Sequence, residues 1–338
     1  MKKNFVIKKN KNFKHSLIII DGFSGSGKTL IAPIISTYKD VQNQAISYDF
    51  DNIVKLNYLK KIDNQTSSEI LKFTAQELLY NNEIGRKINL RKFDHTGVDY
   101  NPKAKHELKK LKIKNTNQIL NKIKKKNLTL TLMSHKIFLN AKLLNNVFKK
   151  NLILIICVRH PVFLFRHYFN YFKKIHNTEK DFSINIELGR KKFPWYFLEI
   201  NTKQSNKLGD NILTLFNFLF KKIKKLKEKE SVIIVDFEKF ISKPKIFLDE
   251  IEKNGKFIKD KSLLKKAFLL SKIPRKKINS GITYVTYGIN NKKISDKQFY
   301  KKELKFIKKN ISNNSNRLLL KLISEYNKTW PNDFRIYE

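Results

Sequence analysis

A glycine-rich segment between two apolar runs constrains this 338-residue chain more than any other feature. Residues 22–29 read Gly-Phe-Ser-Gly-Ser-Gly-Lys-Thr and fit the pattern G-x-x-x-x-G-K-[ST] without a mismatch. The preceding run, Ser16–Asp21, is short, apolar and rich in β-branched residues, which is typical of a buried strand. Leu30–Ile35 follows as a predicted helix, which Pro33 is expected to shorten or kink. The order of strand, loop and helix predicts a phosphate-binding loop at the start of an α/β fold.

The residue types of this loop predict which groups would meet an anion. Gly22, Gly25 and Gly27 allow the backbone to curl, so that successive N–H groups point inward at phosphate or sulfate oxygens. The start of the following helix adds a partial positive charge. Lys28 adds a mobile cation, and Thr29 adds a hydroxyl for Mg²⁺ or for a phosphate oxygen. The residues expected to bind the anion are Gly22, Ser24, Gly25, Ser26, Gly27, Lys28 and Thr29.

Four more apolar runs have the pattern of short strands and alternate with stretches of helical spacing. The predicted strands are Gln44–Asp49, Leu128–Met133, Leu152–Val158 and Val232–Asp236. Residues 215–226 repeat apolar side chains at helical period, and the pattern after about residue 245 is helical to the end. Short strands separated by helices form parallel sheets with right-handed crossovers. We therefore expect a P-loop NTPase-like α/β fold, with a parallel sheet flanked by helices.

No stretch rich in glycine, proline and serine divides the chain. We therefore expect residues 1–14 to form a basic, flexible arm and residues 15–338 to form a single α/β domain. Helical insertions are expected at about 52–126 and 176–230, and the carboxyl-terminal part is expected to be helical. These insertions are the segments expected to shape a substrate pocket.

The chain is strongly basic, with 71 lysines and arginines against 29 aspartates and glutamates and a formal net charge of +42. Only eight of the basic residues are arginine, and the lysines are spread along the chain. Runs such as 221–227 have helical spacing, which is typical of solvated helix faces. A nucleic-acid interface would concentrate its charge and often place stacking aromatics within it. We therefore expect attraction of small anions and no dedicated nucleic-acid binding.

Cysteine content and hydropathy bear on the compartment. The single cysteine, Cys157, excludes an intramolecular disulfide and fits a reducing compartment. The first residues lack the apolar stretch of a signal peptide, and no run reaches the ~18 apolar residues of a spanning helix. These features predict a cytoplasmic protein without a membrane span.

A second candidate anion site follows the strand predicted at Leu152–Val158. Arg159 ends this strand, Pro161 turns the chain, and a helix follows. The arginine is therefore expected at the carboxyl edge of the sheet, where open α/β folds bind ligands. Arg166 and His167 would lie about two turns into that helix and could converge on the same anion. An arginine at this place could also cap a helix or pair with a carboxylate, so both roles stay open.

Together these motifs resemble the sulfotransferase superfamily, whose members transfer a sulfuryl group from 3'-phosphoadenosine 5'-phosphosulfate. The family's sulfate loop follows the first strand, as residues 22–29 do. Its 3'-phosphate is held by a strand-terminal arginine, a proline-containing turn and a helix that bears a serine. Arg159-His160-Pro161 matches the arginine and the turn, and His167 stands at the serine position. The resemblance implies that Arg159 and His167 bind the 3'-phosphate.

Two further fragments extend the resemblance, which runs from about residue 15 to residue 250. Residues 131–135, Thr-Leu-Met-Ser-His, are similar to the segment whose histidine is the family's catalytic base, and this implies that role for His135. Residues 233–244 are similar to the family's strand and the glutamate–hydrophobic–proline segment that follows it.

The chain also departs from the family in two places. Lys28 stands where the family usually has threonine or serine, and a complete Gly-Lys-Thr is more typical of proteins that bind ATP or GTP. The family's basic, glycine-rich carboxyl-terminal segment is only echoed by Arg275–Gly281.

The resemblance implies an enzyme that moves a sulfuryl group from 3'-phosphoadenosine 5'-phosphosulfate to a hydroxyl of a small-molecule or carbohydrate acceptor. Lys28 would neutralise charge on the transferred group. His135 would take the proton of the acceptor hydroxyl, and Asp49 is the other candidate for this base. Asp49 and Asp51 are expected at the end of the second strand, on one face, and the aromatic residues 193–197 either line the acceptor pocket or pack in the core.

The residues alone leave two alternatives open. An ATP-dependent small-molecule kinase would use the same loop with Mg²⁺, organised by Thr29 together with Asp49 or Asp236. A non-catalytic protein that binds nucleotides or polyanions would rely on the net charge. No arrangement of cysteines and histidines predicts a structural metal site.

Overall fold

The computed structural model describes residues 13–331, except 93, 95, 189–190, 201–206, 228, 230, 256, 277 and 279–294. The arm expected at residues 1–14 therefore lies mostly outside the described residues. None of the helices in the described ranges combines the length and the apolar character that crossing a bilayer requires.

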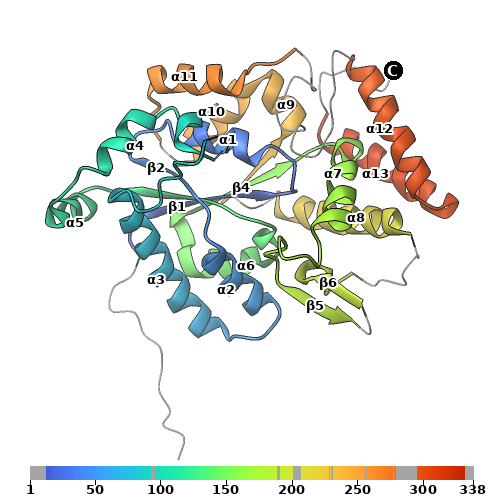
Figure 1. Cartoon of the computed structure of the whole chain (residues 1–338), viewed down its shortest axis with the longest axis horizontal. Coiled ribbons are helices and arrows are strands. Elements are labelled where there is room, and N and C mark those ends of the chain that lie inside the picture. The colour runs from blue at the N-terminus through green and yellow to red at the C-terminus, as the bar shows by residue number, and fades with distance from the viewer. Residues whose placement is uncertain are drawn as a thin grey trace, which may run out of the picture.

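A five-stranded sheet lies at the centre, in the order β2-β3-β1-β4-β7, and each neighbouring pair of strands is parallel (Figure 1). The strands are β1 (Ser16–Gly22), β2 (Val41–Ala45), β3 (Thr129–Met133), β4 (Leu152–Val158) and β7 (Val232–Asp236). The predicted α/β fold, a parallel sheet flanked by helices, is confirmed. Four of the five strands lie within one residue of the predicted bounds, because an apolar run that is buried on both faces is a strong strand signal.

Successive side chains of the central strands enter two separate hydrophobic cores. Leu17 and Ile19 of β1 belong to one core and Ile18 and Ile20 to the other, and all four are fully buried. This follows from the twofold period of a strand, which sends neighbouring side chains to opposite faces. Helices must therefore cover both faces of the sheet.

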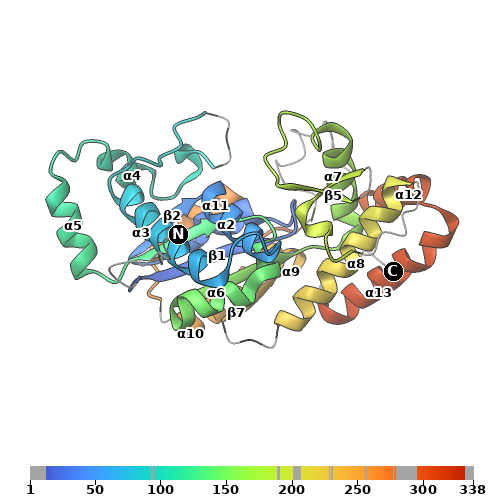
Figure 2. The ribbon, with the colours of Figure 1, turned by 90° about the horizontal axis from the view of Figure 1, so that it is seen from below.

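Four helices that lie above the sheet in Figure 1 supply most of the helical side chains in the core of Ile18 and Ile20, and two further helices add Phe163 and Phe299 to it. The four helices are α1 (Lys28–Ile35), α9 (Phe237–Ser242), α10 (Pro244–Gly255) and α11 (Lys261–Ser271). The other core is shared by α2 (Tyr48–Tyr58), α3 (Asn64–Glu83), α6 (Ala141–Phe148), α7 (Pro161–Lys174), α8 (Leu208–Leu226), α12 (Asp296–Asn310) and α13 (Asn316–Thr329). In Figure 2, α7, α8, α12 and α13 gather at one end of the molecule.

The strand predicted over Gln44–Asp49 is correct only for its first two residues, since β2 is Val41–Ala45. β2 ends at Ala45, and α2 (Tyr48–Tyr58) begins shortly after it. Ser47 is the reason, because its hydroxyl accepts the backbone N–H of Phe50 at 3.2 Å and so caps the helix. The two aspartates of this segment lie in the first helical turn, where the partial positive charge stabilises carboxylates.

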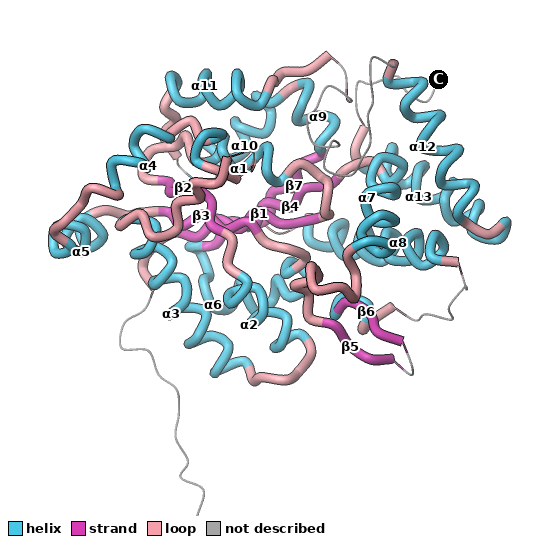
Figure 3. The backbone as a smooth tube through the Cα atoms, in the orientation of Figure 1, coloured by secondary structure: helices cyan, strands magenta, loops and turns pink. Residues whose placement is uncertain are grey.

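The segments expected as helical insertions differ from each other. Within residues 52–126, α3 is followed by α4 (Ala104–Lys110) and α5 (Thr116–Lys125). Within residues 176–230, a hairpin that the sequence pattern did not predict precedes α8. Its antiparallel strands are β5 (Asn185–Leu188) and β6 (Lys191–Pro194), and Figure 3 shows them apart from the main sheet.

Candidate active site

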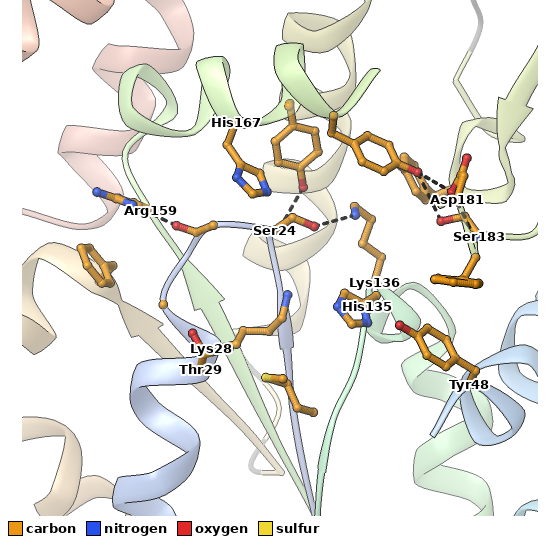
Figure 4. Close-up of a pocket in the computed structure, with 18 of the residues that line it drawn as sticks. Ser24, Lys28, Thr29, Tyr48, His135, Lys136, Arg159, His167, Asp181 and Ser183 are labelled. Atoms are coloured by element: carbon orange, nitrogen blue, oxygen red, sulfur yellow. Dashed lines mark hydrogen bonds between the residues drawn. The ribbon is translucent and has the colours of Figure 1, made fainter. Parts of the chain in front are cut away.

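A pocket of about 410 Å³ opens at the carboxyl ends of the strands. The residues that follow four different strands line it: Gly25 after β1, His135 after β3, Arg159 after β4 and Phe237 after β7. Tyr48, at the start of the helix after β2, completes one wall (Figure 4). A parallel sheet brings its carboxyl ends to one edge, which is where open α/β folds bind ligands.

The glycine-rich loop has the curled backbone expected of an anion-binding loop. Gly22, Gly25 and Gly27 have φ angles of 122°, 82° and 93°, in the region that favours glycine. α1 begins directly after the loop, at Lys28, so its N-terminal N–H groups lie at the pocket. The Lys28 ammonium is buried and donates to the carbonyl oxygen of Phe23 at 3.1 Å. Burial lowers the pKa of this lysine.

A buried carboxylate joins this loop to the segment after β3. Asp21, fully buried at the end of β1, accepts the backbone N–H groups of Gly22 at 2.7 Å, Lys136 at 2.6 Å and Phe138 at 2.7 Å. The loops after β1 and β3 are thereby fixed to one carboxylate. The only sign of this role in the sequence is an aspartate at the end of an apolar strand.

His135 lies in the pocket beside Asp51, one of the two aspartates expected after the second strand. Its ring Nδ1 is 3.8 Å from Oδ2 of Asp51, and the same oxygen accepts its backbone N–H at 3.2 Å. Burial and the nearby Lys28 lower the pKa of His135, so the imidazole is neutral at pH 7 and able to accept a proton. Asp49, in contrast, is exposed on α2 and is not among the residues that line the pocket.

Arg159 enters the pocket opposite His135 and contacts the glycine-rich loop. Its Nη1 donates to the carbonyl oxygen of Gly25 at 3.0 Å, and its guanidinium lies 4.4 Å from the ring centre of Phe237. Its Nε is 3.8 Å from the buried carboxylate of Glu238. Arg159 therefore lines the pocket and also pairs with a carboxylate, and its binding of an anion stays a prediction.

Of the two candidates on α7, only His167 lines the pocket. Its ring lies against the loop, 3.2 Å from the position that a Cβ at Gly25 would occupy. Burial lowers its pKa to about 3, with smaller effects from nearby cations, so it is a neutral donor or acceptor at pH 7. Arg166 points elsewhere, because its Nε forms an ion pair with Glu303 at 2.8 Å.

Four basic residues without a predicted role also line the pocket: Lys55, Lys136, Lys180 and Arg275. Lys136 follows His135, and Arg275 follows α11. Burial and the charge of Arg159 lower the pKa of Arg275, so the two guanidinium groups interact electrostatically. In the sequence, the segment at 275–281 matches the family pattern only in its basic character and its glycine, which is too little to place it at the site. Residues 277 and 279–281 of this segment lie outside the described ranges.

Basic residues outnumber carboxylates among the described residues that line the pocket. Lys28, Lys55, Lys136, Lys180, Arg159 and Arg275 line it, against a single described carboxylate, Asp181. That carboxylate is engaged, because Oδ1 accepts the Tyr171 hydroxyl at 2.9 Å and Oδ2 lies 2.9 Å from the His176 ring. Two of the cations have carboxylate partners that do not themselves line the pocket, Lys55 with Asp51 and Arg159 with Glu238, each at 3.8 Å. The excess of cations among the lining residues is the property expected of a site for a multiply charged anion.

The remaining predicted residues are placed as follows. Asp236 caps α9, accepting the backbone N–H of Glu238 and the Tyr326 hydroxyl, both at 3.0 Å, and does not line the pocket. In the aromatic segment 193–197, Trp195 and Tyr196 are buried and also line the pocket, so packing and pocket roles coincide. Cys157 is buried in β4. The described residues contain no group of three or more histidines, cysteines and carboxylates arranged to hold a metal ion.

His160 makes the fold sensitive to acid. It is fully buried and caps α7, where Nδ1 accepts the Val162 N–H at 3.3 Å, and burial lowers its pKa from 6.5 to about 3. As pH falls, His160 therefore binds a proton in the unfolded chain at a higher pH than in the folded protein. The unfolding free energy decreases as pH falls below 6.5. Between pH 7 and pH 5 this residue alone should cost on the order of 2 kcal/mol.

His160→Asn keeps a capping side chain that does not titrate. Urea unfolding at pH 7 and pH 5 should show a smaller loss of unfolding free energy on acidification for this variant than for the wild type. Equal losses would show that His160 is not held neutral in the folded protein.

No protein-family model matches the chain, and no curated protein matches its sequence. Among solved structures, the sulfotransferase domain of the olefin synthase from Synechococcus PCC 7002 aligns with 96% of this chain and 98% of that domain, at a TM-score of 0.44 and 11% identity. Sulfotransferase STF9 from Mycobacterium avium aligns with 95% of this chain and 78% of that one, at a TM-score of 0.43 and 10% identity. Likenesses this distant do not establish an activity, which has to be inferred from the pocket.

Proposed function

We propose that this protein transfers a sulfuryl group from 3'-phosphoadenosine 5'-phosphosulfate to a hydroxyl of a small-molecule or carbohydrate acceptor. The observation that carries the proposal is that two groups of cationic and hydrogen-bonding residues line one pocket. The loop at residues 22–29 with Lys28 forms the first, and Arg159 with Arg275 and His167 forms the second. A nucleotide with phosphates at both the 5' and the 3' positions is a ligand that needs two such groups.

The residues present fit this donor. The N–H groups of the glycine-rich loop and Lys28 would hold the 5'-phosphosulfate, where the cation would offset charge in the transition state. The charge of Arg159 lowers the pKa of Arg275. Both arginines would bind the 3'-phosphate, and His167 would donate a hydrogen bond to it. The donor supplies the activated sulfuryl group, whose bond to the phosphate oxygen breaks as the acceptor oxygen bonds to sulfur.

His135 would take the proton that the acceptor hydroxyl loses. Its imidazole is neutral, lines the pocket and is accompanied by Asp51, which would stabilise the protonated ring. Asp49, the other candidate for the base, is exposed and does not line the pocket, so we assign the base to His135, with Asp51 as the carboxylate beside it. Asp51 is buried, and burial raises its pKa to about 6, so it carries its charge at pH 7.

The acceptor would enter beside Tyr48 and Phe182. Both side chains are exposed and line the pocket, with ring centres 5.8 Å apart. Figure 4 shows Tyr48 on the same side of the pocket as His135 and away from Arg159. Donor and acceptor would thus approach the loop from opposite sides.

A kinase that depends on Mg²⁺ is the alternative that the complete Gly-Lys-Thr favours. It needs a carboxylate near Thr29, yet Asp49 and Asp236 are not among the residues that line the pocket. Asp21, which ends the strand before the loop, accepts three backbone N–H groups already. The sulfuryl donor, in contrast, needs cations at both ends, and the pocket has them.

Thermal unfolding separates the two activities. Because a ligand that binds only the folded state stabilises it by RT ln(1 + [L]/Kd), 3'-phosphoadenosine 5'-phosphate at 100 times its Kd should add about 2.7 kcal/mol and raise the melting temperature by several degrees. The shift should be the same with Mg²⁺ and with EDTA, and ADP should give a smaller one. A larger shift with ATP and Mg²⁺ than with the 3'-phosphorylated nucleotide would contradict the proposal and favour the kinase.

A further inference from the structure

Lys136 reaches the glycine-rich loop from another strand. It follows β3, has a φ angle of 64°, and donates its backbone N–H to Asp21 at 2.6 Å. A positive φ is uncommon for a lysine, and here the buried carboxylate fixes it. The backbone geometry turns the side chain of Lys136 toward the loop after β1, as Figure 4 shows.

The ammonium of Lys136 lies at the loop, in contact with one hydroxyl and two aromatic rings. Its Nζ lies 3.4 Å from the Ser24 hydroxyl oxygen, 4.5 Å from the ring centre of Tyr196 and 5.3 Å from that of Tyr168. The Tyr168 hydroxyl in turn accepts the backbone N–H of Ser24 at 3.1 Å. Ring faces attract a cation without neutralising it, so these contacts position the charge and leave it available to an anion.

Burial of this cation is costly in the structure as it stands. Lys136 is 5% exposed, and among the described residues its ammonium contacts a hydroxyl and two rings and forms no ion pair. Burial and the charge of Lys28 lower its pKa to about 7. An anion bound between the two lysines would relieve this cost, because it would give both cations a partner of opposite charge.

We propose that Lys136 is the second cation of the phosphate loop and directly contacts the anionic group that the loop binds. The inference rests on the proposed function only in naming that group as the 5'-phosphosulfate of the donor. Lys136 and Lys28 would then approach the group from different segments, the loop after β3 and the start of α1, and Lys136 would add to the stabilisation of charge during transfer. The aromatic residues Tyr168 and Tyr196 position the ammonium.

Direct binding measurements test this contact without knowledge of the acceptor. Isothermal titration at pH 7 with ADP and with 3'-phosphoadenosine 5'-phosphate would compare the wild type with Lys136→Met. Loss of one charged hydrogen bond should weaken both ligands by about 10- to 100-fold. Lys142→Met is the matched control, since Lys142 is exposed on α6 and does not line the pocket, and it should change either affinity less than threefold, roughly.

The pH dependence distinguishes a direct contact from a structural role. Since an uncharged lysine cannot bind the anion, wild-type affinity should fall as pH rises from 7 to 9. In Lys136→Arg the charge persists throughout this range, so affinity should fall less. The titratable groups that interact electrostatically with Lys136 are the same in both proteins: Lys28, Asp21, Lys55, Asp181, His135 and His167.

The outcomes separate this inference from the proposed function. Equal affinities of wild type and folded Lys136→Met for both ligands would overturn the role of Lys136, whatever the preference between the ligands. Weakening of both ligands in a protein that binds ADP as tightly as the 3'-phosphorylated nucleotide would support Lys136 and contradict the sulfuryl donor. If Lys136→Met fails to fold, the difference in pH profile between Lys136→Arg and the wild type decides the question.

Discussion

Replacement of Arg159 by alanine should lower the affinity for 3'-phosphoadenosine 5'-phosphate about 100-fold and leave that for ADP within about fivefold. The expected selectivity follows from position, since the guanidinium lies in the pocket at the end of β4 while the 5'-binding loop follows β1. The residual effect on ADP arises because Arg159 also donates to the Gly25 carbonyl oxygen at 3.0 Å. Isothermal titration with both nucleotides measures the ratio directly.

The ratio of the two affinities distinguishes loss of a 3'-phosphate contact from a general loss of structure. Removal of Arg159 takes a cation away from the buried Glu238, and any resulting destabilisation affects both nucleotides. Arg166→Ala is the control, because this arginine lies on the helix after the same strand but pairs with Glu303 at 2.8 Å, and it should not alter the ratio. Equal losses for both nucleotides in Arg159→Ala would rule out a 3'-phosphate role for this residue.

Gly22→Ala should destabilise the whole fold by about 4 kcal/mol, combining roughly 1–3 kcal/mol of backbone strain with roughly 1–3 kcal/mol of overpacking. Gly22 has a φ angle of 122°, and a Cβ there would lie 2.2 Å from the carbonyl oxygen of Cys157. That oxygen belongs to β4, the neighbour of β1, and accepts the Phe23 N–H at 3.2 Å. The two central strands would therefore have to separate.

Gly25→Ala supplies the comparison for this result. Its φ angle of 82° is also left-handed, but a Cβ would meet only the His167 side chain, at 3.2 Å, and a side chain can move. Urea unfolding should give a loss of about 1–2 kcal/mol for Gly25→Ala. Similar losses for the two variants would show that the contact with β4 is not what constrains Gly22.

Buried strands and the loop between the first strand and its helix could be predicted because their signals are local. The apolar runs that form β1, β3, β4 and β7 have few other conformations that bury them on both sides. β2, with the sequence Val-Gln-Asn-Gln-Ala, is a polar edge strand. Its predicted extent is wrong because Ser47 begins a helix where the sequence pattern suggests more strand.

The composition of the site could be predicted only where a motif announces it. The glycine-rich loop, Arg159 and His135 follow predicted strands, so topology alone brings them to one edge. Lys136 and Arg275 are two among 71 basic residues. Lys136 directly follows His135 and Arg275 begins the basic segment 275–281, but neither pattern assigns a role to the basic residue itself. The place of these two residues in the pocket depends on a carboxylate more than a hundred residues away and on the path of the chain after α11.

The carboxylate of Asp21 links the loops after β1 and β3, so that neither loop can be exchanged without the other. One of its three N–H donors lies in the glycine-rich loop and the other two, on Lys136 and Phe138, lie in the loop after β3. A chimaera that imported only residues 16–29 into another parallel sheet would bury this carboxylate with most of its donors missing, at a cost that could prevent folding. A chimaera should therefore fold only if it carries both loops, which are distant in the sequence but adjacent in the structure.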